Sequence, residues 1–131
     1  TFNRNGDITH IAGIESRGFV VGSVLASVIG VPFVMIRKKG SKYPGSLFEE
    51  TYGTEYSEDS IVIQEGILGH TNRVLIADDL IATGGSLLAT KRLIEMTEAK
   101  VVGAVTILNL KYLNDPALEN IKIISKENIY K

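Results

Sequence analysis

Short apolar runs alternate along this chain with segments of helical periodicity. Five runs have the length and apolar character of buried strands. They span residues 8–14, 31–37, 73–77, 101–108 and 121–124. Between them, residues 19–29 and 86–96 carry apolar side chains three and four positions apart, which predicts helices, and Gly30 is suited to end the first helix. Strands that alternate with helices predict an α/β protein with a central parallel sheet.

The apolar pattern lapses between residues 38 and 59. Lysine, glycine, serine, tyrosine and glutamate dominate this segment, and Pro44-Gly45 marks a turn. Residues 51–56 and 60–64 alternate well enough to form the two strands of a ribbon. A polar segment of this length within a compact domain is typical of a functional lid or of disorder. We therefore expect a flexible β-ribbon lid over residues 38–59.

The segment VLIADDLIATGGS, residues 74–86, carries the strongest chemical signal. Its apolar strand leads into two adjacent carboxylates, Asp78 and Asp79, and then into a loop of small and hydroxylated residues. Ligands of α/β proteins bind at the carboxyl ends of parallel strands. Glycines let backbone N–H groups approach a phosphate, and the following helix adds its positive end, so a side chain on Gly84 is expected to fill phosphate space. Paired carboxylates suit sugar hydroxyls or a hydrated Mg²⁺, and the combination predicts a phosphorylated sugar.

Other interpretations of this segment explain less of it. A P-loop requires a lysine after the glycines, and a dinucleotide-binding fingerprint requires GxGxxG, but neither pattern is present. A strand end with an N-terminal helix cap would account for Asp79 or Gly84 taken singly. It does not account for two acids followed by five small or hydroxylated residues.

This segment resembles the phosphoribosyl-pyrophosphate (PRPP) motif of the type I phosphoribosyltransferases. Further segments fall in the order and approximate spacing of the adenine phosphoribosyltransferases. They are IAGIESRGF at residues 11–19, IRKKG at residues 36–40, Pro44-Gly45, and Glu55-Tyr56. ESRGF and IRKKG distinguish this group from the xanthine, orotate and hypoxanthine relatives. The resemblance implies a type I phosphoribosyltransferase fold in a single catalytic domain, residues 1–131, in which the family's N-terminal hood segment is missing or rebuilt.

The resemblance also implies roles for the motif residues. The phosphate loop would hold the 5-phosphate of PRPP through five consecutive residues, Ala82, Thr83, Gly84, Gly85 and Ser86. Asp78 and Asp79 would meet the ribose hydroxyls, directly or through Mg²⁺ and water, and Mg²⁺ is the cofactor implied. Leu80 would give the purine an apolar wall.

Positive charge for the pyrophosphate is expected from two places. Arg17 would contact pyrophosphate, because its planar guanidinium suits phosphate oxygens. Arg37, Lys38 and Lys42 would add charge, although Ser41 places Lys42 one position away from the family pattern. Outside such a setting, a run of cations after a strand is usually a solvated edge.

Glu55 is the expected general acid/base, since the resemblance places it in the ribbon that closes over the site. Tyr56 would help to seal the closed lid. Glu49, Glu50 and Glu58 lie nearby, and the TEY context favours Glu55 among the four. A solvent-facing strand residue is the alternative for Glu55.

Composition restricts the remaining possibilities. A net charge of −1 gives no general attraction to nucleic acid or to anionic membranes, and no apolar run is long enough to span a bilayer. The lack of cysteine excludes disulfides and fits a cytoplasmic protein. His10 and His70 are too far apart in sequence to suggest a metal site.

The function expected from the resemblance is purine salvage, in which adenine and PRPP yield AMP and pyrophosphate. A homodimer is expected on the same basis, with the Arg37 segment near the neighbouring subunit's site. Three alternatives stay open: a PRPP-binding regulator without turnover, a fragment that binds PRPP or AMP only, and a phosphoribosyltransferase for another purine.

Overall fold

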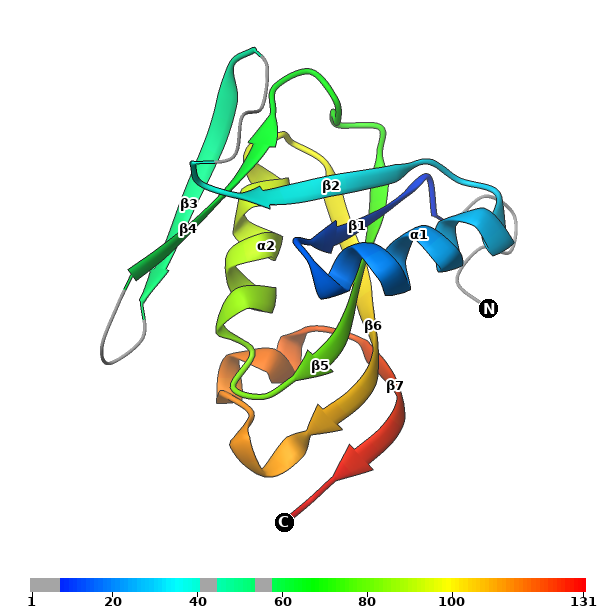
Figure 1. Ribbon diagram of the computed structural model, residues 1–131, viewed down its shortest axis with the longest axis vertical. Coiled ribbons are helices and arrows are strands. Elements are labelled where there is room, and N and C mark those ends of the chain that lie inside the picture. Colours follow the sequence, from blue (N-terminus) through cyan, green and yellow to red (C-terminus); the bar gives the residue numbers. More distant parts are fainter. Residues whose placement is uncertain (1–7, 41–44, 54–57) are drawn as a thin grey trace.

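The computed structural model describes residues 8–40, 45–53 and 58–131, and in that part of the chain one seven-stranded sheet carries helices on both faces (Figure 1). The strands are β1 (His10–Ile14), β2 (Phe33–Lys38), β3 (Leu47–Gly53), β4 (Glu58–Gln64), β5 (Arg73–Ile81), β6 (Lys100–Leu110) and β7 (Ile123–Ile129). The α-helices are α1 (Arg17–Ile29) and α2 (Gly85–Met96). Two short 3₁₀ helices, η2 (Lys111–Leu113) and η3 (Pro116–Asn120), lie between β6 and β7. No helix in the described ranges is long and apolar enough to cross a bilayer.

The sheet has a parallel part and an antiparallel ribbon, in the order β3-β4-β2-β1-β5-β6-β7. β2, β1, β5, β6 and β7 run parallel to one another, which confirms the predicted α/β class. β3 and β4 form an antiparallel pair, and β4 joins the sheet antiparallel to β2 through Arg37 and Val62.

The predicted ribbon is present, but its strands begin earlier than predicted. β3 starts at Leu47 because Phe48 and Tyr52 turn alternate side chains toward the core, while charged residues between them hide this pattern in the sequence. The segments 41–44 and 54–57 lie outside the described residues, so the flexibility of residues 38–59 stays a prediction.

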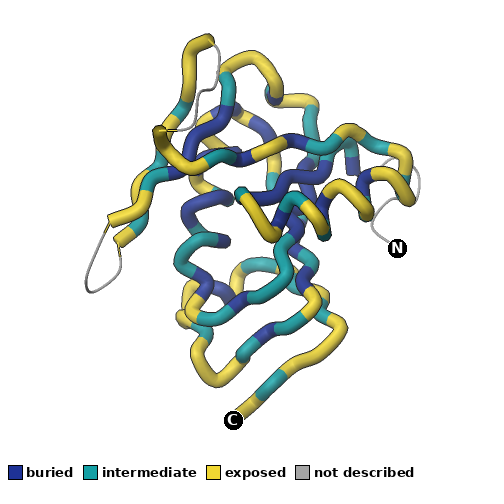
Figure 2. Tube along the Cα trace, in the orientation of Figure 1, coloured by how far each residue is buried: buried dark blue, intermediate teal, exposed yellow. Residues whose placement is uncertain are grey.

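The strand β5 supplies side chains to both cores because successive residues point to opposite faces. Val74 and Ile76 belong to the core cluster that contains Leu93 and other residues of α2. Leu75 and Ala77 belong to the cluster beneath α1. Buried segments accordingly run through the centre of the molecule in Figure 2. The two helices therefore cover opposite faces of the central strands.

The helix α1 lies against the sheet through its smallest residues. Gly18, Gly22 and Ala26 are buried, whereas Val20 and Val24 of the apolar pattern are 67% and 60% exposed. The inward face therefore combines these small residues with Val21, Leu25 and Ile29, which are partly buried against the core.

The small residues are required by a close approach of backbones. A Cβ atom added to Gly13 of β1 would lie 2.4 Å from the carbonyl oxygen of Gly18. A Cβ atom added to Gly22 would lie 2.4 Å from Cε1 of Phe33, whose ring also makes an edge-to-face contact with Phe19. Glycine at these positions lets the N-terminus of α1 sit directly over the end of β1.

We predict that Gly13→Ala lowers the free energy of unfolding by about 1–3 kcal/mol, because the new methyl group meets backbone that cannot rotate away. Chemical denaturation measures this change. Gly69→Ala is the matched control, since no described atom lies within 4 Å of a Cβ atom there. Equal stability of the two variants would show that α1 does not depend on this close approach.

Candidate active site

The strand β5 continues past the end of β1, and this offset creates the site. The pairing of β1 with β5 ends at Gly13 and Ala77, whereas β6 stays paired with β5 as far as Ile81. The predicted strand end at residue 77 is therefore too early. Asp78 and Asp79 lie inside β5, beyond its last described pairing with β1.

A cavity of about 320 Å³ occupies the space beside this offset. It is lined by Ile14, Glu15, Ser16, Arg17, Gly18, Lys38, Tyr52, Asp78 and Ser86. These residues come from the carboxyl ends of β1 and β2, the first turns of α1 and α2, the ribbon strand β3, and β5. The predicted site residues Arg17, Lys38, Asp78 and Ser86 are thus brought together.

The amino ends of both α-helices meet at this cavity. Ser16 precedes α1 and Gly84 precedes α2. Within the described residues, neither helix has a side-chain hydrogen bond at its N-cap or an acidic residue in its first turn. Because helix N-termini carry partial positive charge, the cavity suits a ligand with more than one anionic group.

The two acids of the motif differ in environment. Asp79 Oδ2 lies 3.2 Å from Nε of Arg17, and the Asp79 N–H donates to Asp78 Oδ1 at 2.8 Å. Burial raises the pKa of Asp78 to about 6; the Asp79 carboxylate adds to this rise and Arg17 opposes it. Ionised Asp78 therefore gains from a ligand hydroxyl or a cation in the cavity.

Glu15 organises Arg37 and Lys38, the two basic residues at the end of β2. Its Oε1 accepts a hydrogen bond from the Lys38 N–H at 2.9 Å and lies 3.4 Å from Nε of Arg37. Lys38 lines the cavity, but Arg37 is not among the described lining residues. The contribution of Arg37 to pyrophosphate binding stays a prediction, and Lys42 lies outside the described residues.

The phosphate loop is held from behind by the segment between β6 and β7. The Ala82 carbonyl oxygen accepts from Asn114 Nδ2 at 2.7 Å, and the Thr83 carbonyl oxygen accepts from the Asp115 N–H at 2.9 Å. Gly84 has a φ of 92°, and a Cβ atom there would lie 2.3 Å from Cδ1 of Leu118. The expectation that a side chain on Gly84 would fill phosphate space is therefore wrong, since it would enter the core.

Comparison with known proteins shows which family the chain belongs to. Residues 1–129 match the model of the phosphoribosyl transferase domain. The chain belongs to the phosphoribosyltransferase family.

Individual members of the phosphoribosyltransferase family resemble the chain closely. The adenine phosphoribosyltransferase of Rhodospirillum rubrum is 48% identical over 103 residues, which form 79% of this chain and 60% of that protein. The crystal structure of adenine phosphoribosyltransferase from Thermoanaerobacter pseudethanolicus matches with a TM-score of 0.88 at 35% identity, over 97% of this chain and 74% of that one.

A third relative, the Trypanosoma brucei adenine phosphoribosyltransferase in complex with AMP, pyrophosphate and ribose-5-phosphate, has a TM-score of 0.84 at 34% identity, over 96% of this chain and 58% of that one. The chain spans about 60% of the length of curated relatives that it matches.

Tyr52 is a cavity residue that the sequence interpretation missed. Burial raises the pKa of its hydroxyl, and the carboxylates of Asp59 and Asp78 raise it further, so the group stays a neutral donor. The alternation of Phe48 with Tyr52 along β3 was the available signal.

Several other predicted site residues are not among the described lining residues of this cavity, namely Asp79, Leu80, Ala82, Thr83, Gly84 and Gly85. Leu80 is partly buried beside Leu108 of β6 and is not a described lining residue, so its contact with a base stays a prediction. Glu55 and Tyr56 lie outside the described residues.

The pKa of Asp78 generates a prediction about stability. Because folding raises this pKa, the ionised Asp78 carboxylate lowers the free energy of unfolding. This loss of stability is absent below about pH 4, grows between about pH 4 and 6, and is complete above about pH 6. Asp78→Asn should raise the free energy of unfolding at pH 8 by an amount on the order of 1 kcal/mol, allowing for partial exposure, and change it little at pH 4. Denaturation at the two pH values measures the difference. The exposed Asp59→Asn is the control, and an equal gain in both variants would refute the account.

Substitution should lower stability at one glycine of the loop and weaken ligand binding at the other. Gly84→Ala should lower the free energy of unfolding by about 1–3 kcal/mol through strain and the clash with Leu118. Gly85→Val should change it by less than about 1 kcal/mol, since Thr83 Oγ1, at 3.8 Å, is the only described atom within 4 Å of a Cβ atom there. The valine would instead occupy the open side of the loop and weaken AMP binding at least tenfold. Calorimetric titration measures the AMP affinity of Gly85→Val. An unchanged affinity would show that the phosphate does not bind to this loop.

Proposed function

We propose that this chain acts as an adenine phosphoribosyltransferase, which transfers the 5-phosphoribosyl group of PRPP to adenine and releases AMP and pyrophosphate in purine salvage. The observation that carries the proposal is the convergence of two uncapped helix N-termini on a cavity lined by Asp78. PRPP bears a phosphate, a diphosphate and ribose hydroxyls, and this cavity offers a matching environment for each.

Each described group has a distinct role in the proposed reaction. The loop before α2 binds the 5-phosphate through backbone N–H groups. Arg17 and Lys38 bind the pyrophosphate, and Arg17 leaves its ion pair with Asp79 to do so. Asp79 and Asp78 then accept hydrogen bonds from the ribose hydroxyls. Since the C1–O bond breaks toward a cationic sugar, stabilising the departing pyrophosphate lowers the barrier most.

A magnesium ion fits the residues present. In the described part of the chain, no group of three or more metal-binding side chains occurs. Two carboxylates are nevertheless sufficient, because Mg²⁺ keeps several waters and takes its other ligands from substrate phosphates. Asp78 and Asp79 would hold it through water or PRPP oxygens, and the ion would neutralise charge on the leaving group.

The names of relatives support adenine as the acceptor. The curated relatives at 45–48% identity are adenine phosphoribosyltransferases. The Saccharomyces cerevisiae enzyme is described in complex with adenine. A cytoplasmic location, expected from the sequence, belongs to this proposal as well.

Release of pyrophosphate in the presence of Mg²⁺, PRPP and adenine tests the proposal. Hypoxanthine, guanine and xanthine serve as parallel substrates. Turnover with adenine at least tenfold above the others is the expected result. Preference for another base would reassign the substrate, and PRPP binding without turnover would favour the non-catalytic alternatives.

The general acid/base role gives a direct prediction. Glu55→Gln should reduce turnover by about 10²–10⁴-fold and leave AMP affinity within about threefold, because the role is expressed in the transition state. Glu58→Gln, at the start of β4, is the matched control and should retain near-normal turnover. Small, equal losses in both would remove Glu55 from the chemistry.

A homodimer is the proposed assembly, and the outer face of α1 supports it. Val20, Val24 and Val28 are exposed there and line an apolar groove that continues to Ile107 of β6. The outer edge of α1 is marked as exposed in Figure 2. A contiguous apolar surface of this kind is typical of an interaction site.

Light scattering on Val24→Glu tests the dimer. We predict a dimer for the unmodified chain and a monomer for the variant, since each glutamate would be an unpaired charge buried in the apolar interface. Met96→Glu, at the end of α2, is the control and should stay dimeric. A monomeric unmodified chain, or a dimeric Val24→Glu, would exclude this interface.

A further inference from the structure

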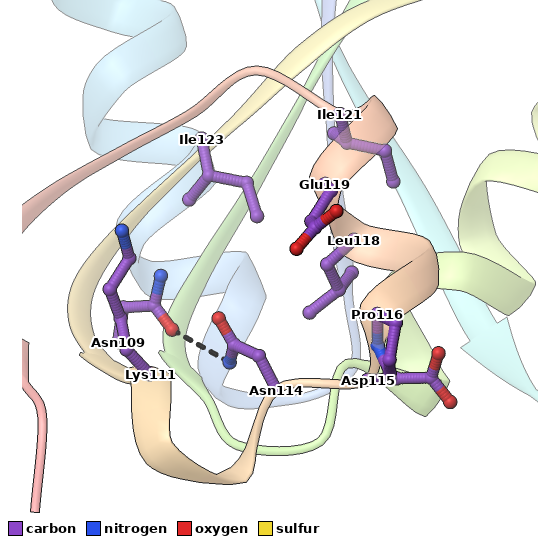
Figure 3. A pocket seen from close by; sticks show the side chains of 9 residues that line it. All are labelled: Asn109, Lys111, Asn114, Asp115, Pro116, Leu118, Glu119, Ile121 and Ile123. Carbon is purple, nitrogen blue, oxygen red and sulfur yellow. Dashed lines mark hydrogen bonds between the residues drawn. The ribbon is translucent and has the colours of Figure 1, made fainter.

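A second cavity, of about 420 Å³, lies on the other side of the phosphate loop (Figure 3). It is lined by Asn109, Lys111, Asn114, Asp115, Pro116, Leu118, Glu119, Ile121 and Ile123. None of the described residues that line this cavity lines the cavity of the candidate active site. Its volume is within the range of sites for small organic ligands.

The hydrogen bonds of Asn114 determine how two side-chain amides are oriented. Asn114 Nδ2 lies 2.7 Å from the Ala82 carbonyl oxygen and 3.2 Å from that of Leu110. Both partners are acceptors, so the atom facing them must be the nitrogen. Asn114 Nδ2 also lies 3.0 Å from Asn109 Oδ1, which must therefore be the oxygen.

These orientations leave one donor and one acceptor unused. Among the described residues, no hydrogen-bond partner exists for the Asn109 Nδ2 group, although Asn109 is only 1% exposed. Asn114 Oδ1 likewise has no partner in that part of the chain. Figure 3 shows both free ends directed into the cavity. A buried amide donor without a partner is unfavourable, and a ligand can supply the missing bond.

The rest of the cavity restricts the ligand. Leu118, Ile121 and Ile123 give it apolar walls, which suit a flat ring. Glu119 lies on the wall opposite the amides and adds an acceptor. Asn114 Oδ1 and the Glu119 carboxylate can accept from a ligand amino group, while Asn109 Nδ2 and the Lys111 ammonium can donate to a ring nitrogen beside it.

We propose that this cavity, formed by Asn109, Asn114 and the apolar residues of η3 and β7, binds an amino-substituted nitrogen heterocycle of purine size. The ring nitrogen accepts from Asn109 Nδ2, and the exocyclic amino group donates to Asn114 Oδ1. Because Asn114 also bonds to Ala82, the ligand lies directly behind the phosphate loop. This binding does not depend on the proposed transferase activity.

Titration of the isotopically labelled chain with adenine, without PRPP, tests the site by NMR. The side-chain amide signals of Asn109 and Asn114 should shift in a saturable way. The probe 6-dimethylaminopurine, which cannot donate from its amino nitrogen, should shift them at least tenfold more weakly. Asn109→Leu should weaken adenine binding about tenfold, whereas Asn120→Leu, on the exposed end of η3, should not.

The outcomes separate this proposal from the transferase activity. Adenine that binds or reacts without moving the two amide signals would overturn the pocket and leave the proposed function intact. Amide shifts without any pyrophosphate release would support the pocket and overturn the proposed function. Equal shifts with both heterocycles would overturn the assigned hydrogen-bond pattern, whether or not Asn109→Leu folds.

Discussion

The candidate site depends first on how closely α1 approaches β1. Gly13 and Gly18 meet without room for a Cβ atom, so the helix begins almost on top of the strand end. This position places Arg17 within ion-pair distance of Asp79 and brings the positive end of α1 to the cavity. The offset between β1 and β5 then leaves Asp78 facing the same space. A wider separation of α1 from β1 would disrupt the Arg17–Asp79 ion pair, move the positive end of α1 from the cavity and remove both from the space that Asp78 faces.

The candidate site also brings positive and negative groups close together. Two helix N-termini, Arg17 and Lys38 attract anions, while Glu15 pairs with Arg37 and Asp79 pairs with Arg17. The raised pKa of Asp78 reflects the same confinement, because burial penalises its charge when no ligand is bound. In the proposed function, a phosphorylated sugar with its cation would balance these opposing charges more fully than a single phosphate would.

Sequence patterns predicted the local elements well and the contacts between distant segments poorly. The α/β class, both α-helices and the acid pair were readable because periodicity and motif chemistry are local. The apolar spacing in residues 19–29 did not reveal that Gly18, Gly22 and Ala26 are the buried residues of α1 while Val20 and Val24 are exposed. Leu118 beneath Gly84 could not be predicted, because thirty-odd positions of chain separate two atoms that only the fold brings together. Tyr52 was missed because Glu49 and Glu50, which lie between it and Phe48, hide the apolar alternation of β3.

A crystal structure of the chain with Mg²⁺ and PRPP tests the central claim most directly. The account predicts the 5-phosphate on the backbone N–H groups of the loop before α2, the ribose hydroxyls on Asp78 and Asp79, and Arg17 moved from Asp79 to the pyrophosphate. It also predicts that α1 keeps its contact with β1. PRPP bound away from Asp78, or an Arg17–Asp79 pair that persists beside bound pyrophosphate, would contradict it.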